Sequence, residues 1–256
     1  MNKRIDLNCD MAEGFGVYTL GNDAAIMPLI SSANIACGFH AGDPHVMYRT
    51  MAIAREHGVG VGAHPGYPDM PGFGRRSMAL TPREAYETVA YQIGAFLGVA
   101  RAVGAVATHV KIHGAMYNDA AKNRVLADAL AQAVRDVDSS LVFVGLAGSC
   151  MISAAEASGL RTASEVFADR AYQLDGSLVP RSHPQALHAD TGAAVRQVLQ
   201  IVEQGTVTAI TGEQVLVRAD SVCLHGDGAH AVDFAAATRK ALADRGIDVL
   251  GFRRGE

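Results

Sequence analysis

The sequence contains few lysines and has no excess of positive charge. Four of its 256 residues are lysine, and 22 Lys plus Arg stand against 26 Asp plus Glu, for a formal net charge of −4. Proteins that bind nucleic acid concentrate Lys and Arg to neutralise phosphates, so this balance argues against a nucleic-acid partner. The lysines also exclude a P-loop, because none of them follows a glycine as the GxxxxGK motif requires.

Long apolar runs and paired cysteines are missing as well. No stretch approaches the roughly 18 uninterrupted apolar residues that a membrane span needs. The N-terminal MNKRIDLNCD becomes acidic where a signal peptide would become apolar, which predicts a cytoplasmic protein with no membrane contact. The absence of a CxxC pair predicts reduced core cysteines rather than a disulfide framework. The four cysteines are Cys9, Cys37, Cys150 and Cys223.

The remaining composition is that of one large globular domain with many histidines. A length of 256 residues is usual for an α/β barrel, and 49% hydrophobic with 19% charged residues is ample for one buried core. We therefore predict a single domain over residues 1–256. The ten histidines are about twice the number expected from average usage, and they indicate where the chemistry lies.

Short apolar runs alternate with amphipathic stretches that begin at a capping residue and end at glycine. Two predicted helix starts are clear, at Asp43-Pro44 and at the capping box Thr81–Glu84. A helix between two strands carries the chain back, so that the next strand runs in the same direction as the first. The strands are therefore expected to be parallel, in an irregular seven-stranded (β/α) barrel or an open doubly wound sheet. The predicted strands are 4–10, 32–36, 59–64, 107–113, 141–146, 160–167 and 221–226. Residues 206–218 depart from this alternation of strand and helix, and their pattern predicts an inserted β-hairpin.

Polar residues alternate with apolar ones in three of these strands. They are Asp6, Asn8 and Asp10 in the first, His109, Lys111 and His113 in the fourth, and His225 and Asp227 in the last. Strands between helices are normally apolar on both faces, so a polar face needs an interior use. In a parallel barrel it points into the lumen, and the active site lies at the carboxyl ends of the strands. The competing interpretation is a satisfied polar core without catalysis.

Loops after the strands carry further candidates. The two loops after the second and third strands contain His40, Asp43, His45, His64, Asp69, Arg75 and Arg76. Asp43 is explained as a helix N-cap, and the paired arginines are either anion ligands or solvated loop charges. The polar segment 165–188 has the length of a lid or binding loop, with a partner-docking surface as the alternative. Its charged residues include Glu165, Asp169, Arg170 and Arg181.

Six motifs resemble the lactam-utilisation family, in consistent order from residue 5 to about 250. They are IDLNCDMAEGFG at 5–16, ISSANIACGFHAGDP at 30–44, GVGVGAHPGYPD at 58–69, VKIHGAMYN at 110–118, EVFADRAYQLDGSLVPRS at 165–182 and CLHGDG at 223–228. The resemblance implies a barrel of the glycoside hydrolase and polysaccharide deacetylase type. It also implies a hydrolase that opens the cyclic amide 5-oxoproline to L-glutamate with hydrolysis of ATP, which acts with Mg²⁺. Two partner subunits of this 5-oxoprolinase, B and C, are implied as well.

Opening a stable amide requires an activated water and a protonated leaving nitrogen, which gives the candidate residues hypothetical roles. The general base is Asp10 or Asp6, and His113 or His225, beside Asp227, moves a proton. The phosphate ligands are Lys111, Arg75 and Arg76, and the substrate carboxylate binds Arg170 or Arg181. The other candidate binding residues are Asn8, Glu13, His40, His64, Glu165 and Asp169.

A bound divalent metal is a further possibility, since the resemblance extends to deacetylases that use an aspartate and two histidines. Its candidate ligands are Asp10, His40, His45 and His64. Two other functions stay open. One is a metal-dependent amide hydrolase or polysaccharide deacetylase that acts alone without ATP, and the other is a non-catalytic subunit that binds the substrate. Fold analogy does not separate these functions, because barrels host many chemistries.

Overall fold

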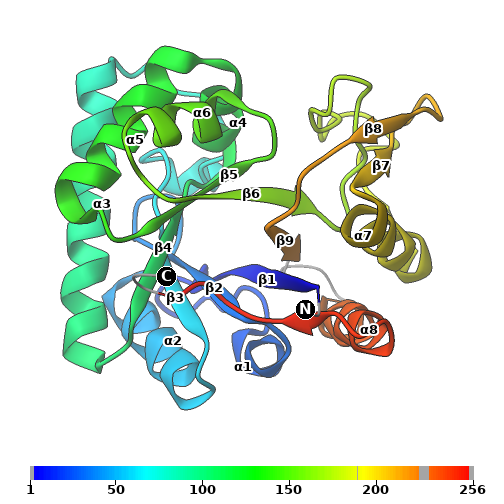
Figure 1. Cartoon of the computed structure of the whole chain (residues 1–256). Helices are drawn as coiled ribbons and strands as arrows, with labels where there is room; N and C mark the ends of the chain where they lie inside the picture. Colours follow the sequence, from blue (N-terminus) through cyan, green and yellow to red (C-terminus); the bar gives the residue numbers. More distant parts are fainter. Residues whose placement is uncertain (1–2, 189, 225–230, 254–256) are drawn as a thin grey trace.

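A computed structural model describes residues 3–188, 190–224 and 231–253 of the chain (Figure 1). The predicted site residues His225 and Asp227 lie outside the described residues. Seven parallel strands form a ring in the order β1-β2-β3-β4-β5-β6-β9, and pairing of β9 with β1 closes it. They are β1 (Arg4–Met11), β2 (Ser32–Ala36), β3 (Gly60–His64), β4 (Ala107–Lys111), β5 (Val142–Leu146), β6 (Thr162–Phe167) and β9 (Ser221–Leu224). The predicted seven-stranded parallel barrel is confirmed, and the open sheet is excluded.

Two smaller strand features accompany the barrel. The predicted hairpin is present as the antiparallel pair β7 (Thr206–Thr208) and β8 (Gln214–Leu216). Its turn contains Gly212 at φ +100°, a conformation that favours glycine. The short strand β10 (Asp248–Val249) pairs in parallel with the start of β1 and was not predicted, because two residues are too few to show a period.

Helices surround the barrel in Figure 1. They are α1 (Asp23–Ile26), α2 (Pro44–Glu56), α3 (Pro82–Val103), α4 (Gly114–Lys122), α5 (Arg124–Asp138), α6 (Cys150–Ala157), α7 (Thr191–Gln204) and α8 (Ala231–Asp244), with 3-10 turns at Met27–Leu29 and Met70–Gly72. Both predicted helix starts are confirmed, since Asp43 caps α2 and Thr81 forms a capping box with Glu84 at α3. Within the described ranges, no helix has the length and apolar character needed to cross a membrane.

The strand alternation separates an apolar layer from a polar interior. Leu7 and Cys9 of β1 are fully buried in the apolar core. Their neighbours Asp6 and Asn8 are also buried, and they bond to polar side chains of other strands instead. The barrel interior is therefore a polar network that leads to the carboxyl ends of the strands. All four cysteines are free, three of them buried and Cys150 half-buried.

Candidate active site

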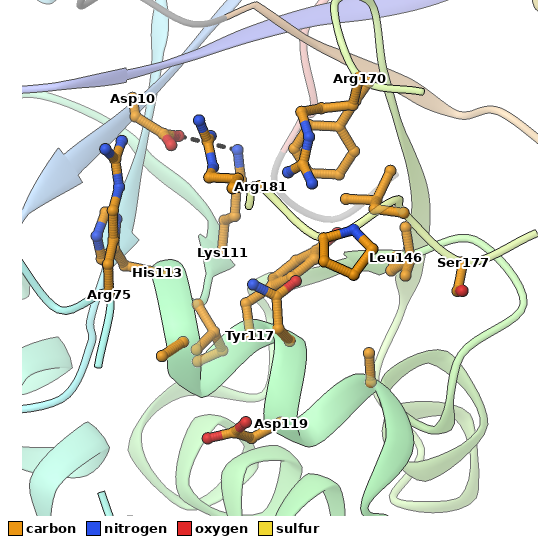
Figure 2. Close-up of a pocket in the computed structure, with 18 of the residues that line it drawn as sticks. Asp10, Arg75, Lys111, His113, Tyr117, Asp119, Leu146, Arg170, Ser177 and Arg181 are labelled. Carbon is orange, nitrogen blue, oxygen red and sulfur yellow. Dashed lines mark hydrogen bonds and ion pairs between the residues drawn. The ribbon is translucent and has the colours of Figure 1, made fainter. Parts of the chain in front are cut away.

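A cavity of about 580 Å³ opens at the carboxyl ends of the strands (Figure 2). Its lining includes residues at the ends of β1, β3, β4 and β6, namely Asp10, His64, Lys111 and Phe167. Loop residues and α4 complete the walls. Among the described residues, five Lys or Arg side chains line the cavity against three Asp or Glu, so the charge of this lining favours an anionic ligand.

Lys111 lies at the centre of a buried charge network. Its Nζ is 2.9 Å from an oxygen of Asp10, 2.9 Å from Oε1 of Glu165 and 3.1 Å from Oδ1 of Asn8. Burial opposes the charge of Lys111, but the adjacent Asp10, Cys223 and Glu165 outweigh it and raise the pKa of the ammonium well above its usual value. Because an ammonium has three donors and these contacts use them, the geometry does not favour Lys111 as a phosphate ligand.

Glu165 is fully buried and is held by two further donors. Tyr117 of α4 donates its hydroxyl to Oε2 at 2.7 Å, and Asn8 donates its amide to Oε1 at 3.0 Å. Glu165 therefore acts as a buried counter-ion rather than as a substrate ligand. The sequence interpretation missed Tyr117, although it lies one helical turn after His113, on a helix that begins at the end of a strand with polar residues.

Asp10 accepts two hydrogen bonds at the cavity floor and lies close to the ring of His64. Lys111 and Asn34 donate to Oδ1 at 2.9 and 2.8 Å, and Oδ2 is 3.3 Å from Nε2 of His64. Burial alone would raise the pKa of Asp10, but His64 and Lys111 outweigh it and hold the pKa of its carboxyl well below its usual value. Asp10 is therefore an anion at neutral pH that faces the cavity.

Asp6, the alternative base, is separated from this cavity. It lines a second cavity with Arg4 and Leu250, near the amino end of β1. Ser31 and Ser32 donate to its Oδ1 at 2.7 Å each, and Ser221 donates to Oδ2. Burial raises the pKa of Asp6 to about 6. The geometry therefore favours Asp10 over Asp6 as the base at the carboxyl ends of the strands.

Three histidines and one glutamate gather beside Asp10. One potential ligand atom from each of Glu13, His40, His64 and His113 lies within 4.8 Å of the other three. The rings of His40 and His113 stack with centroids 3.7 Å apart. Burial, together with nearby His64, lowers the pKa of His113 to about 3, so this ring is neutral at physiological pH.

This group differs from the set of metal ligands expected from the sequence. His45 lies exposed in the first turn of α2 and is not part of it. Glu13 and His113 join His40 and His64 instead, while Asp10 contacts the group through His64. His113 was identifiable from the alternation in the fourth predicted strand. No sequence pattern marked Glu13 as a metal ligand, apart from its place in the loop after the first predicted strand.

The arginine candidates divide into two groups. Arg75, Arg170 and Arg181 line the cavity, and Figure 2 shows them around Asp10 and Lys111. Arg76 has a largely exposed side chain and pairs with Asp69, so it is not placed as a cavity ligand. Burial, followed by the nearby charge of Arg181, lowers the pKa of Arg170 to about 10. Two neighbouring guanidinium groups repel each other, and an anion between them would relieve this.

The segment after β6 forms one wall of the cavity. Residues 168–188 contain isolated bridges, turns and bends but no helix or named strand. Residues 177–181 line the cavity together with Arg170, as expected of a binding loop. Closure of this segment as a lid stays a prediction. Asp169 does not line the cavity, and its backbone carbonyl accepts a hydrogen bond from the amide of His188.

Comparisons with known proteins agree on one group of relatives. The model of a family described as the LamB/YcsF family matches residues 5–255. The chain is 58% identical over 246 residues to the A subunit of 5-oxoprolinase from Tolumonas auensis, covering 96% of this chain and 98% of that protein. It is 55% identical to the corresponding 5-oxoprolinase component of Bacillus subtilis, which carries the same name, and the match covers 96% of each chain.

Solved structures extend the similarity to the fold. The crystal structure of a lactam utilization protein from Thermus thermophilus superposes with a TM-score of 0.93 at 45% identity, covering 97% of this chain and all of the other. A family 4 carbohydrate esterase from Streptomyces lividans, in complex with acetate, superposes with a TM-score of 0.52 at 13% identity, covering 97% and 92%. The second similarity is one of fold alone, and it agrees with the predicted barrel of the deacetylase type.

Proposed function

Because the chain belongs to the LamB/YcsF family, we propose that it is one component of a 5-oxoprolinase, which opens the lactam ring of 5-oxoproline to give L-glutamate. The family resemblance seen in the sequence motifs is thereby confirmed. The observation that carries the proposed reaction is the cavity, in which an anionic carboxylate, Asp10, faces several arginines. Hydrolysis of ATP to ADP and phosphate, and the need for partner subunits B and C, belong to the same proposal.

Asp10 is proposed to orient the attacking water and to accept its proton. Its Oδ1 is fixed by Lys111 and Asn34, and its side chain is 16% exposed. An ionised carboxylate fixed on one side can hold a water in one orientation on the other. His113 is a weaker candidate for moving protons, because its Nδ1 faces His64 and its Nε2 bonds to the carbonyl of Phe73.

The arginines are proposed to bind the anionic groups of the substrate. Arg170 and Arg181 come from the segment after β6, and Arg75 comes from the loop after β3. A guanidinium matches a carboxylate or a phosphate with two parallel hydrogen bonds. We assign Arg170 and Arg181 to the carboxylate of 5-oxoproline, and Arg75 to a phosphoryl group on the lactam oxygen.

ATP, with Mg²⁺, would supply the activation by phosphorylating the amide oxygen, which makes the ring carbon a better electrophile. Addition of water and departure of the protonated ring nitrogen would then give an acyl phosphate, and a second water would release phosphate and glutamate. The positive cavity suits a phosphorylated lactam, whereas the sequence has no P-loop for the nucleotide itself. We therefore place the phosphorylated substrate in this cavity and the nucleotide with the partner subunits B and C or at their interface with this chain.

The test is to assemble the chain with its two partner subunits and to measure glutamate and ADP formation. Asp10→Asn should reduce turnover by about 100-fold or more while the folded state is retained, since a positioned general base contributes roughly 10²–10⁴-fold. Asp128→Asn is the matched control, because Asp128 lies exposed on α5 and pairs with Arg124. Unchanged turnover in the Asp10→Asn complex would refute the assignment of the base.

The same experiment separates the other two functions. A stand-alone amide hydrolase would act on an N-acetylated sugar without the partners and without ATP. A non-catalytic binding subunit would show altered affinity for 5-oxoproline in Asp10→Asn but unaltered turnover of the complex at saturating substrate. The proposed function requires glutamate and ADP to appear together, and to do so when all three subunits are present.

A further inference from the structure

Four side chains beside Asp10 have the arrangement of a metal site. Glu13, His40, His64 and His113 bring their ligand atoms within 4.8 Å of one another, and the three histidines are buried. We propose that these four residues bind a divalent transition-metal ion. The inference rests on this geometry and not on the proposed reaction, and its ligand set differs from the one expected from the sequence.

The hydrogen bond of His64 fixes which of its nitrogens can bind a metal. Nδ1 lies 2.7 Å from the backbone carbonyl of Lys111. A carbonyl oxygen only accepts, so Nδ1 carries the proton and donates it. In the neutral ring Nε2 then carries the lone pair, and it points at the group. A carbonyl partner of this kind is the usual outer-shell contact of a metal-binding histidine.

His113 presents the opposite nitrogen in the same way. Its Nε2 lies 2.9 Å from the backbone carbonyl of Phe73, so Nε2 donates and Nδ1 carries the lone pair. Nδ1 of His113 and Nε2 of His64 are 2.9 Å apart. Two lone pairs at this distance repel each other, and a positive species between the rings is needed to make the contact favourable.

A shared proton would satisfy the pair of His64 and His113 but would leave His40 without a partner. The His40 side chain is fully buried, and among the described residues neither of its ring nitrogens has a hydrogen-bond partner. Its Nε2 lies 3.9 Å from Oε1 of Glu13. A buried imidazole without a partner is costly, and a metal ion would serve all three rings at once.

The backbone at two glycines lies so close to the rings of His40 and His113 that a side chain there would clash with them. A Cβ at Gly74 would come within 2.7 Å of Cβ of His40 and 2.8 Å of Cδ2 of His113, and Gly74 has φ +62°. A Cβ at Gly66 would lie 3.0 Å from Nδ1 of His40. The glycines therefore allow the loop after β3 to press the two stacked rings together.

The donor set indicates the kind of ion. Three imidazole nitrogens and one carboxylate suit Zn²⁺, Co²⁺, Ni²⁺ or Fe²⁺, whereas Mg²⁺ prefers oxygen ligands. Tetrahedral ligands at 2.0–2.1 Å from Zn²⁺ lie about 3.3 Å from each other. Glu13 Oε1 is 3.7 Å from Nδ1 of His113 and 3.9 Å from Nε2 of His40, so these two distances would contract by about 0.4–0.6 Å. All the ligand atoms lie within 4.8 Å of one another, so no pair would have to contract by more than about 1.5 Å, while the His64–His113 pair at 2.9 Å would widen slightly.

The test uses Co²⁺ as a spectroscopic probe on the chelator-treated full chain. One Co²⁺ per chain should bind and give the visible absorption bands of a four-coordinate nitrogen and oxygen site, and Zn²⁺ should displace it. His40→Ala and Glu13→Gln should each weaken Co²⁺ binding by about 100-fold or more, since loss of an outer-shell partner alone costs about 10–100-fold. His45→Ala is the matched control, because His45 is exposed nearby on α2.

Circular dichroism of each variant shows whether its fold is retained, and Glu13→Gln provides the conservative change if His40→Ala does not fold. Failure of the wild-type chain to bind Co²⁺, or binding that neither variant weakens, would overturn the metal site and favour a proton shared by His64 and His113. These measurements need no substrate and no partner protein, so their outcome is independent of the proposed 5-oxoprolinase activity.

Discussion

Replacing Lys111 by methionine keeps most of the side-chain volume and removes a buried positive charge. The ammonium is bound by Asp10 and Glu165 at 2.9 Å each, and the Lys111 side chain is 3% exposed. After the substitution Glu165 keeps Tyr117 and Asn8 as donors but loses its counter-ion. Removing one partner of a buried ion pair costs about 3–5 kcal/mol, because the other charge remains buried without compensation.

We therefore expect Lys111→Met to lower the free energy of unfolding by about 3–5 kcal/mol at pH 7. The measurement is urea denaturation followed by circular dichroism, with the midpoint and slope fitted together. Lys122→Met is the matched control, because Lys122 lies exposed at the end of α4 and its loss should change the free energy by less than about 0.5 kcal/mol.

A double-mutant cycle separates the charge effect from packing. The double variant Lys111→Met with Glu165→Gln removes both charges of one pair. It should therefore be more stable than the sum of the two single losses predicts, by about 1–3 kcal/mol. Strictly additive losses, or a Lys111→Met protein as stable as the Lys122→Met control, would refute the charge network as the reason for the burial of Lys111.

Two further predictions concern Asp6 and the arginines. The folded pKa of Asp6, about 6, lies above the ordinary aspartate value of 3.8, so the folded state binds more protons between these values and its stability falls as pH rises through them. Relative to wild type, Asp6→Asn should gain about 2.4 kcal/mol between pH 4 and pH 7 in urea denaturation, and a constant difference would contradict this. Arg181→Gln should raise the KM for 5-oxoproline about 10–100-fold with a smaller change in kcat, as one charged hydrogen bond is lost. An unchanged KM, as expected for the exposed control Arg124→Gln, would remove Arg181 from the substrate site.

The polar face of the barrel could be predicted from the sequence, because alternation along a strand is a local property. Alternation does not show, however, how far along the strand a residue lies from its carboxyl end. Asp6 and Asp10 share one face of β1, yet four residues of strand separate them by about 13 Å. That distance places Asp10 on the cavity at the carboxyl ends and Asp6 among serines near the amino end. The choice between them required the register of the neighbouring strands.

The loops were predicted less well, because their side-chain directions depend on contacts that are distant in sequence. Arg75 and Arg76 are adjacent, but Asp69 holds Arg76 outside the cavity through an ion pair. Likewise, His45 follows His40 by five residues and lies exposed on a helix, while Glu13 and His113 reach the histidine group from the ends of other strands. Spacing along the chain could not distinguish these pairs.

Lys111 connects the two halves of the candidate site through different atoms. Its side chain binds Asp10 and Glu165, whereas its backbone carbonyl accepts the hydrogen bond from Nδ1 of His64. A substitution at Lys111 changes the side chain and leaves the carbonyl in place. A loss of stability in Lys111→Met therefore arises first at the carboxylates and reaches the histidine group through the contact of Asp10 with His64, since the hydrogen bond that orients His64 is retained. The charge network and the proposed metal site are thus joined where Asp10 meets His64, and Lys111→Met perturbs the first without removing a ligand atom of the second.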